Sequence, residues 1–271
     1  MKINDTDKQR HYDEKTRFYE EIIQKMLKNE ADVLEECRKA PETAAERLFE
    51  LSDKMLDLAS LYMALNGISL SVLNLRDENS LVEARRAISK AIIYIENIVT
   101  GKVDVPYSDY EGNLAELAQV SPEKKYYTVR KIGASIDLLK YGYGDNTKWR
   151  WSFVDVEGRF IAVAKNLLDL KQAFSNNDPS EADYAPLHYH LHLVKDLLSQ
   201  QAHRYQERFS LAMKRADDMR LAINYLSALK QFHVLLNEHQ EAEEIKKKLD
   251  VWMTTYQNEL KKERPASPES S

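Results

Sequence analysis

Glycine, proline and cysteine are all scarce in this chain. Seven glycines and seven prolines occur among 271 residues, and several of them lie between segments with periodic apolar residues. A β fold with many turns would need more of both, so their scarcity favours long helices. Cys37 is the only cysteine, which excludes an intrachain disulfide. We expect Cys37 to be a buried small apolar residue on its helix rather than a reactive thiol.

Long apolar runs and an excess of one charge are missing too. A membrane-spanning helix needs about 18 to 20 apolar residues in succession, and the closest run, AIIYIENIV, is interrupted by Glu96. The first residues are charged and contain no apolar signal core. The net charge is −5 with both signs interspersed, whereas a nucleic-acid binder would show a basic patch. These absences predict a cytoplasmic protein with no membrane span and no nucleic-acid partner.

The strongest helical pattern runs from Trp149 to Phe174. Large apolar residues recur there at alternating spacings of four and three, and a second apolar row flanks them. A helix that is apolar over so wide an arc must be covered on more than one side. We therefore predict one central helix over this stretch, against which the others pack. The first row is Trp149, Phe153, Val156, Phe160, Val163, Leu167, Leu170 and Phe174, and the second is Val154, Ile161 and Leu168.

Seven further segments show helical periodicity, so the chain is expected to have about eight helices. Short connections between successive helices favour antiparallel hairpins. The predicted fold class is all-α, with antiparallel helical hairpins that form either a bundle or a short α-superhelix. The seven segments are residues 5–39, 42–66, 79–100, 122–141, 180–213, 216–237 and 240–262.

Several helix ends carry recognisable signals. Asn66-Gly67 is a plausible C-terminal cap, after which ISLSVLNL is expected to be a helical or irregular connection. Asn79 or Ser80 can begin the third helix, with Glu83 as the partner in a capping box. Ser121-Pro122 is a good start for the next one. Within the first helix the apolar row weakens at Asn29-Glu30, which predicts a bend or break.

The longest irregular stretch, residues 101–121, is the predicted boundary between two parts of the chain. Long loops inside compact domains are usually functional or linkers. We expect an N-terminal helical part over residues 1–100 and a C-terminal helical part over residues 122–263. The last residues, 264–271, contain nothing to bury and are predicted to be a disordered tail.

Two segments resemble the second helix of the tetratricopeptide hairpin. In EARRAISKAIIYIE, Glu83-Ala84 is followed by Ile88 and Ala91, small and apolar residues at close-packing positions. The segment LLNEHQEAEEIKKKL around Ala242 is similar. The first-helix signature of that family and its period of about 34 residues do not recur. The resemblance implies a protein-binding scaffold.

A polar face near residue 190 is the first candidate for chemistry. His188 and His192 are four residues apart on a predicted helix, and Asp196 follows at the same spacing. Such a set can ligate zinc or another transition metal. The alternative is a solvated face opposite the apolar seam of the same helix. No HExxH motif, paired Glu-x-x-His motif or cysteine cluster accompanies it.

Two other places are candidates for binding a partner. Trp151 lies beside basic residues and off the main apolar row, so it is a candidate anchor for another protein, and less so for stacked bases. In the loop YSDYEG, Tyr107 and Tyr110 are candidates for a docking or phosphorylation site. The alternative for these tyrosines is that they cover an edge of the core.

Catalytic motifs are missing from the sequence. We find no nucleophile–base pair, no glycine-rich phosphate loop and no aspartate-rich metal motif. The pattern therefore predicts a non-enzymatic cytoplasmic adaptor or scaffold that binds other proteins and carries no cofactor. Two alternatives stay open: an enzyme or sensor that uses the His188, His192 and Asp196 face, and a homo-oligomeric structural subunit that assembles through its first and last helices.

Overall fold

The computed structural model describes residues 5–144, 150–175, 178–212 and 214–263. Within these ranges the chain forms ten α-helices and no strand, and eight of the helices have seven or more residues. The predicted all-α fold with about eight long helices is confirmed. The helices are α1 (Asp5–Lys39), α2 (Ala44–Leu73), α3 (Glu78–Ile98), α4 (Glu111–Ala115), α5 (Pro122–Tyr143), α6 (Arg150–Asn166), α7 (Leu170–Ser175), α8 (Tyr184–Leu211), α9 (Ala216–Leu235) and α10 (His239–Glu263).

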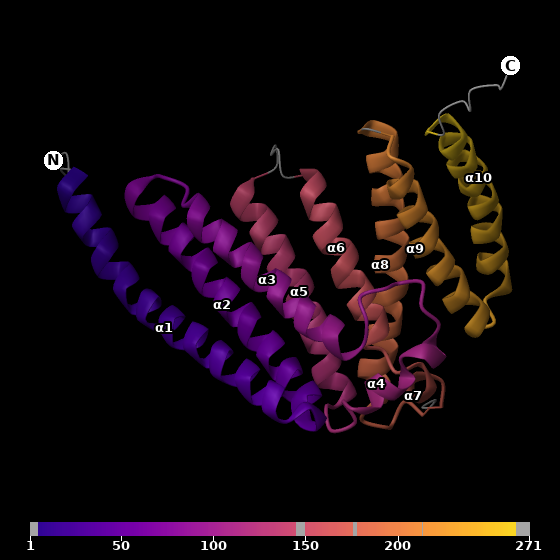
Figure 1. The fold of residues 1–271 in the computed structure, drawn as a ribbon, viewed down its shortest axis with the longest axis horizontal. Helices are drawn as coiled ribbons and strands as arrows, with labels where there is room; N and C mark the ends of the chain where they lie inside the picture. The colour runs from indigo at the N-terminus through magenta and orange to yellow at the C-terminus, as the bar shows by residue number, and fades with distance from the viewer. Residues whose placement is uncertain (1–4, 145–149, 176–177, 213, 264–271) are drawn as a thin grey trace, which may run out of the picture.

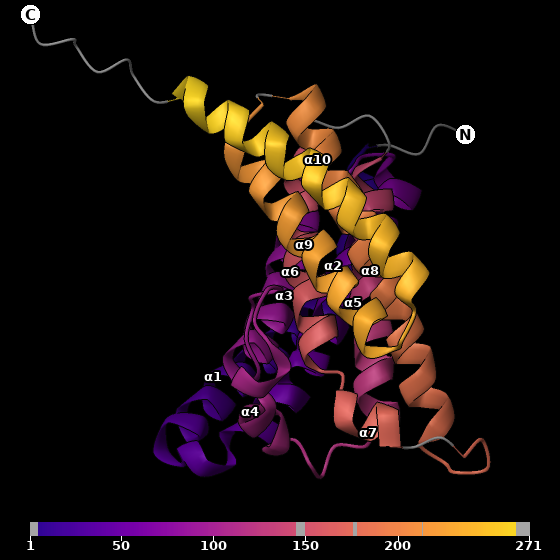
Figure 2. The same ribbon diagram turned by 90° about the vertical axis from the view of Figure 1, so that its right-hand side faces the viewer.

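Successive long helices run antiparallel and lie side by side across the molecule (Figure 1). The pairs α2–α3, α5–α6 and α8–α9 follow one another, with α1 packed on α2 at one end and α10 packed on α9 at the other. Figure 2 shows α3, α6 and α9 in one layer and α5 and α8 in the other. Contacts from α2 to α5 and from α5 to α8 run along the second layer. The apolar core is continuous from Ile23 on α1 to Leu249 on α10. The division of the chain into two helical parts at residues 101–121 stays a prediction.

The predicted central helix is interrupted. Helix α6 ends at Asn166 and α7 begins at Leu170, because the Asp169 side chain accepts a hydrogen bond from the Gln172 backbone amide (3.0 Å) and so caps α7. The helix is covered on more than one side, as predicted: every residue from Phe160 to Leu168 is buried, and α6 contacts α3, α5 and α8. It is not the helix against which all the others pack, since α1, α2 and α10 make their main contacts elsewhere in the described part of the chain. Trp149 lies outside the described residues.

Helix α2 continues past its predicted end. Asn66-Gly67 lies inside the helix, which ends at Leu73 with Asn74 in the left-handed conformation (φ 56°) as its cap. The Asn66 side chain accepts a hydrogen bond from the Asp77 backbone amide (2.9 Å). Asn66 therefore binds a backbone group that lies beyond the end of the helix, and it does not end the helix itself. The prediction of a cap at Asn66-Gly67 was wrong.

Other helix ends follow the sequence more closely. Ser121 caps α5 by accepting a hydrogen bond from the Lys124 amide (3.2 Å), with Pro122 in the first turn, as predicted. The N-cap of α3 is Asp77 rather than the predicted Asn79 or Ser80: its carboxylate accepts hydrogen bonds from the backbone amide and the hydroxyl of Ser80. Cys37 is a buried free cysteine, as expected.

One stretch has the length and composition of a membrane span. From Pro41 to Leu73 the helical chain contains a window of 18 residues with mean hydropathy 1.4, and one third of that window is buried. The same helix packs against α1, α3 and α5, as a core helix of a helical protein does.

Candidate functional site

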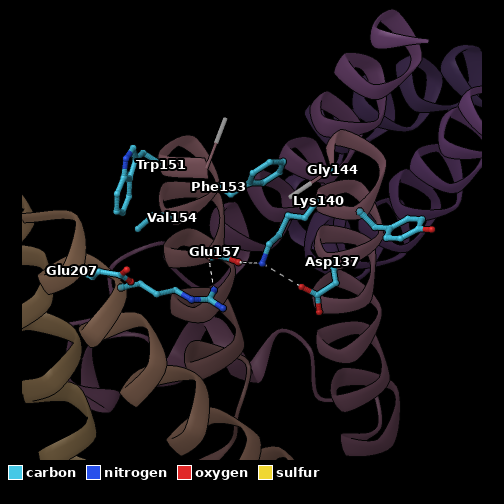
Figure 3. Close-up of a pocket in the computed structure, with 10 residues that line it drawn as sticks. Asp137, Lys140, Gly144, Trp151, Phe153, Val154, Glu157 and Glu207 are labelled. Atoms are coloured by element: carbon cyan, nitrogen blue, oxygen red, sulfur yellow. Dashed lines mark hydrogen bonds and ion pairs between the residues drawn. The ribbon is translucent and has the colours of Figure 1, made fainter. Parts of the chain in front are cut away.

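A groove of about 390 Å³ lies between α5, α6 and α8 (Figure 3). Helix α6 contributes Trp151 and Phe153, and Tyr141 of α5 lies at the edge. The apolar and aromatic walls surround a charged floor made by Lys140, Glu157 and Arg204. Of the candidate site residues predicted from the sequence, Trp151 is the one that lines this groove.

Glu157 organises the floor of the groove. Its side chain is buried, and one carboxylate oxygen accepts from the Lys140 ammonium (2.8 Å) while the other contacts the Arg204 guanidinium (2.5 Å). Lys140 is also 3.6 Å from Asp137 (Figure 3). A buried carboxylate needs such partners to offset the loss of water. Glu157 of α6 therefore holds Lys140 of α5 and Arg204 of α8 at defined positions in the groove.

The sequence contains a signal for Glu157 that the motif search missed. Glu157 stands four residues after Phe153 and three before Phe160, so it falls on the buried face of the helix. Charged residues are almost never fully buried without a partner. A charge on the apolar row therefore indicates an ion pair with neighbouring helices, although the sequence does not say which ones.

The backbone of Trp151 is held in place by a side chain of α8. The guanidinium of Arg208 on α8 donates to the Trp151 carbonyl (3.1 Å) and also pairs with the buried Asp218 on α9 (2.5 Å) and with Asp155 (2.9 Å). The indole itself is partly exposed. The start of α6 is thus tied to the α8–α9 pair, and a large aromatic side chain is held at the groove wall.

The two tyrosines of the YSDYEG loop mainly serve the structure. Tyr110 is 1% exposed, so it offers no surface to a partner in this conformation. Tyr107 is partly buried, and its hydroxyl donates to Asp169 (3.0 Å). Burial, followed by that hydrogen bond to Asp169, raises the pKa of the Tyr107 phenol. This is the arrangement expected of side chains that cover a core edge and fasten residues 101–121 to the break between α6 and α7.

The His188, His192 and Asp196 face is not assembled into a ligand set. His188 stacks on Tyr184 with ring centroids 3.9 Å apart, and its Nδ1 lies 3.0 Å from the Tyr184 carbonyl oxygen. His192 and Asp196 are exposed. Among the residues that the structure describes, no three His, Cys, Asp or Glu side chains are grouped so that they could hold a metal ion. The geometry gives the metal hypothesis no support.

Two buried polar groups near α7 were also missed. His190 is buried, its Nε2 lies 2.9 Å from the Ala164 carbonyl oxygen, and burial lowers its pKa to about 4. Lys165 donates to the Val105 carbonyl (2.8 Å), and burial lowers its pKa to about 8. Both side chains bind backbone carbonyl oxygens across elements, so their role in this arrangement is to hold segments together.

Comparison with known proteins gives a family for the chain. A search of curated proteins and a search of solved structures each found no match. A model of the TP0443 family matches residues 8–260, which is nearly the whole chain of 271 residues. The match covers the groove and all ten helices except the ends of α1 and α10. The chain therefore belongs to the TP0443 family.

Proposed function

We propose that this protein is a non-enzymatic cytoplasmic adaptor that binds another protein through the groove between α5, α6 and α8. The observation that carries the proposal is the placement of Trp151 at the wall of a groove whose floor is the Lys140–Glu157–Arg204 ion-pair network. Tryptophan and arginine are enriched among the residues that dominate protein interfaces.

The groove is prepared for binding in two ways. Glu157 holds Lys140 and Arg204 in place, so these long side chains lose less conformational freedom when a partner arrives. Arg208 fixes the backbone of Trp151. Preorganisation of this kind improves affinity without adding contacts.

The side-by-side helical pairs support an α-superhelix as the wider architecture, in keeping with the tetratricopeptide resemblance. In such arrays each helical pair contacts mainly its neighbours, and the exposed helix faces form an extended binding surface. The contacts from α2 to α5 and from α5 to α8 fit that arrangement.

The test is affinity capture of the tagged full chain from native extract, with partners identified by mass spectrometry. A Trp151→Ala variant is compared with Trp252→Ala, which removes a partly exposed tryptophan on α10, outside the groove. Circular dichroism checks that both variants are folded. We expect a reproducible stoichiometric partner that Trp252→Ala retains and Trp151→Ala loses. Recovery of the bare protein, or equal capture by both variants, would contradict the proposal.

A further inference from the structure

The floor of the groove presents positive charge and hydrogen-bond donors to the solvent. The side chain of Glu157 is only 8% exposed, and its two oxygens contact Lys140 and Arg204. The cations themselves are 35% and 38% exposed. A guanidinium group has several N–H donors, and Arg204 contacts Glu157 through Nη1. Donors of both cations therefore remain for a ligand, whereas the oxygens of Glu157 are covered.

Asp137 places an acceptor beside these donors. It precedes Lys140 by about one turn of α5, and its carboxylate is 3.6 Å from the Lys140 ammonium. That distance is longer than a hydrogen bond, and the Asp137 side chain is 77% exposed, so its oxygens remain available. Figure 3 shows Asp137 and Lys140 directed toward each other next to Glu157. A negative and a positive group thus meet at the same place in the groove.

Aromatic rings form the walls above this charged floor. Trp151 and Phe153 of α6 line the groove (Figure 3), and Tyr141 of α5 lies at its edge. Trp151 is partly exposed, and Arg208 holds its backbone in place. Aromatic side chains pack well against other rings in offset or edge-to-face arrangements. The walls therefore favour a ligand that carries a ring.

Charges of both signs surround the groove in the part of the chain that the structure describes. A ligand with only negative charge would face Asp137, and one with only positive charge would face Lys140 and Arg204. Like charges in contact are unfavourable, so the groove favours a ligand that carries both signs. The cations that line the groove or contact its lining are Arg76, Arg85, Lys140, Arg204 and Arg208, and the carboxylates, with the partners of Arg208, are Asp137, Asp155, Glu157, Glu207 and Asp218.

We propose that the groove between α5, α6 and α8 binds a free α-amino acid with an aromatic side chain. The carboxylate of the ligand accepts hydrogen bonds from Lys140 and Arg204, and its ammonium donates to Asp137. Its ring packs on Trp151. The two charges of an amino acid are attached to one carbon atom, which suits a cation and a carboxylate 3.6 Å apart. The groove volume of about 390 Å³ is within the range of small-molecule sites.

The ligand would regulate the adaptor function proposed above. It occupies the groove that the proposed function assigns to a protein partner and covers Trp151, so ligand and partner exclude each other. This regulatory step rests on the proposed function, whereas binding of the amino acid itself does not. A ligand that binds only the free adaptor lowers the apparent affinity of the partner.

The test is isothermal titration calorimetry with the full chain and four small molecules that differ by one group each. L-phenylalanine carries all three elements, 3-phenylpropionate lacks the ammonium, 2-phenylethylamine lacks the carboxylate, and L-serine lacks the ring. We expect L-phenylalanine to bind about tenfold more tightly than each of the others, since every missing group leaves one charged or aromatic contact unmade. No binding of L-phenylalanine, or equal binding of any of the other three, would overturn the inference.

A pair of aspartate variants locates the site. Asp137→Asn should weaken L-phenylalanine about tenfold and leave 3-phenylpropionate unweakened, because only the first ligand has an ammonium for Asp137. The matched control is Asp217→Asn on α9, which is 64% exposed and also has a cation three residues later, Arg220 at 3.2 Å. Circular dichroism checks that both variants are folded. If the two variants have the same affinity for L-phenylalanine, the assigned site is wrong.

Capture in the presence of the ligand separates this inference from the adaptor function. Saturating L-phenylalanine should reduce capture of the stoichiometric partner about tenfold, while the same concentration of L-serine should not; undiminished capture would overturn the regulatory step. If L-phenylalanine does not bind and capture still yields a partner that Trp151→Ala loses, this inference fails and the adaptor function stands. If L-phenylalanine binds as expected and capture yields no partner, the site stands and the adaptor function fails.

Discussion

The hydroxyl of Tyr94 on α3 donates a hydrogen bond to the carboxylate of Glu30 on α1, across 64 positions of the chain. Lys90, one turn earlier on α3, donates to the other carboxylate oxygen (2.7 Å). Glu30 is 5% exposed. The predicted bend or break at Asn29-Glu30 is not a break, because α1 continues from Asp5 to Lys39. Glu30 interrupts the apolar row of α1 because its carboxylate binds Tyr94 and Lys90 on α3.

Removal of the Tyr94 hydroxyl should destabilise the protein. Tyr94→Phe leaves a buried carboxylate oxygen without its donor, and we expect a loss of about 1–3 kcal/mol in the free energy of unfolding. Urea denaturation monitored by circular dichroism measures it. Tyr141→Phe, at a residue 85% exposed, is the control and should change stability by less than about 0.5 kcal/mol. Identical midpoints for the two variants would show that the Glu30 contact contributes nothing.

Gly158 should not tolerate even a methyl group. A Cβ there would lie 2.2 Å from the Tyr205 hydroxyl oxygen, and the Tyr225 hydroxyl donates to the Gly158 carbonyl (2.6 Å). The glycine lets α6 approach α8 and α9 closely. Gly158→Ala should destabilise the protein by about 2 kcal/mol, because the added methyl group overpacks the contact between the helices. This cost is larger than the gain from the better helix propensity of alanine.

Gly67 provides the matched control for that substitution. It lies inside α2, and a Cβ built there meets nothing within 4 Å. Gly67→Ala should therefore stabilise the protein by about 0.5–1 kcal/mol. In a thermal melt the two variants should move the midpoint in opposite directions. Adding Tyr205→Phe to Gly158→Ala should recover part of the loss; if it does not, the clash lies elsewhere.

Loss of the Glu157 charge should loosen the groove. Glu157→Gln leaves Lys140 and Arg204 without the carboxylate that pairs them. Breaking a buried pair costs about 3–5 kcal/mol, but both cations are more than one third exposed, so water screens them and we expect about 2 kcal/mol. Asp137→Asn, at a side chain 77% exposed, should cost under about 0.5 kcal/mol. Equal stability of the two variants in urea would contradict the role given to Glu157.

His190 should make the protein sensitive to acid. Burial lowers its pKa from 6.5 to about 4, so between these values the unfolded chain binds a proton that the folded chain does not. The stability that the neutral imidazole contributes is therefore complete above pH 6.5 and is lost as the pH falls to about 4. The shift corresponds to roughly 3 kcal/mol.

Comparison of two histidine variants isolates this effect from the carboxylates. His190→Gln and His192→Gln are unfolded in urea at several values between pH 7 and pH 4. The wild type and His192→Gln, whose side chain is exposed, should lose about 3 kcal/mol more over this interval than His190→Gln does. Parallel pH profiles for all three proteins would mean that His190 is not held neutral by burial.

Periodicity predicted the helices because it records which residues face the core. The rows around Phe153, Phe160 and Leu168 are buried as their spacing indicates, and Ser121-Pro122 begins α5 because a cap is a local interaction between neighbours. Of the candidate site residues, Trp151 was found at the groove because its position off the apolar row implied exposure. For Tyr110 the sequence left a docking site and a place at the core edge both open, and its burial agrees with the second, because the elements that cover a loop side chain can be distant in sequence.

The amino-acid sequence alone determined the all-α class, the number of long helices and the residues that form the core, because each depends on short-range spacing. Only the tertiary structure decided where polar groups find partners. Asp169 ends the central helix by capping α7 and binding Tyr107, and Glu157 becomes the floor of a groove by meeting Lys140 and Arg204. Such pairings join residues on different elements, and the physical reason they stay hidden in the sequence is that a buried charge requires a partner but does not specify its place in the chain.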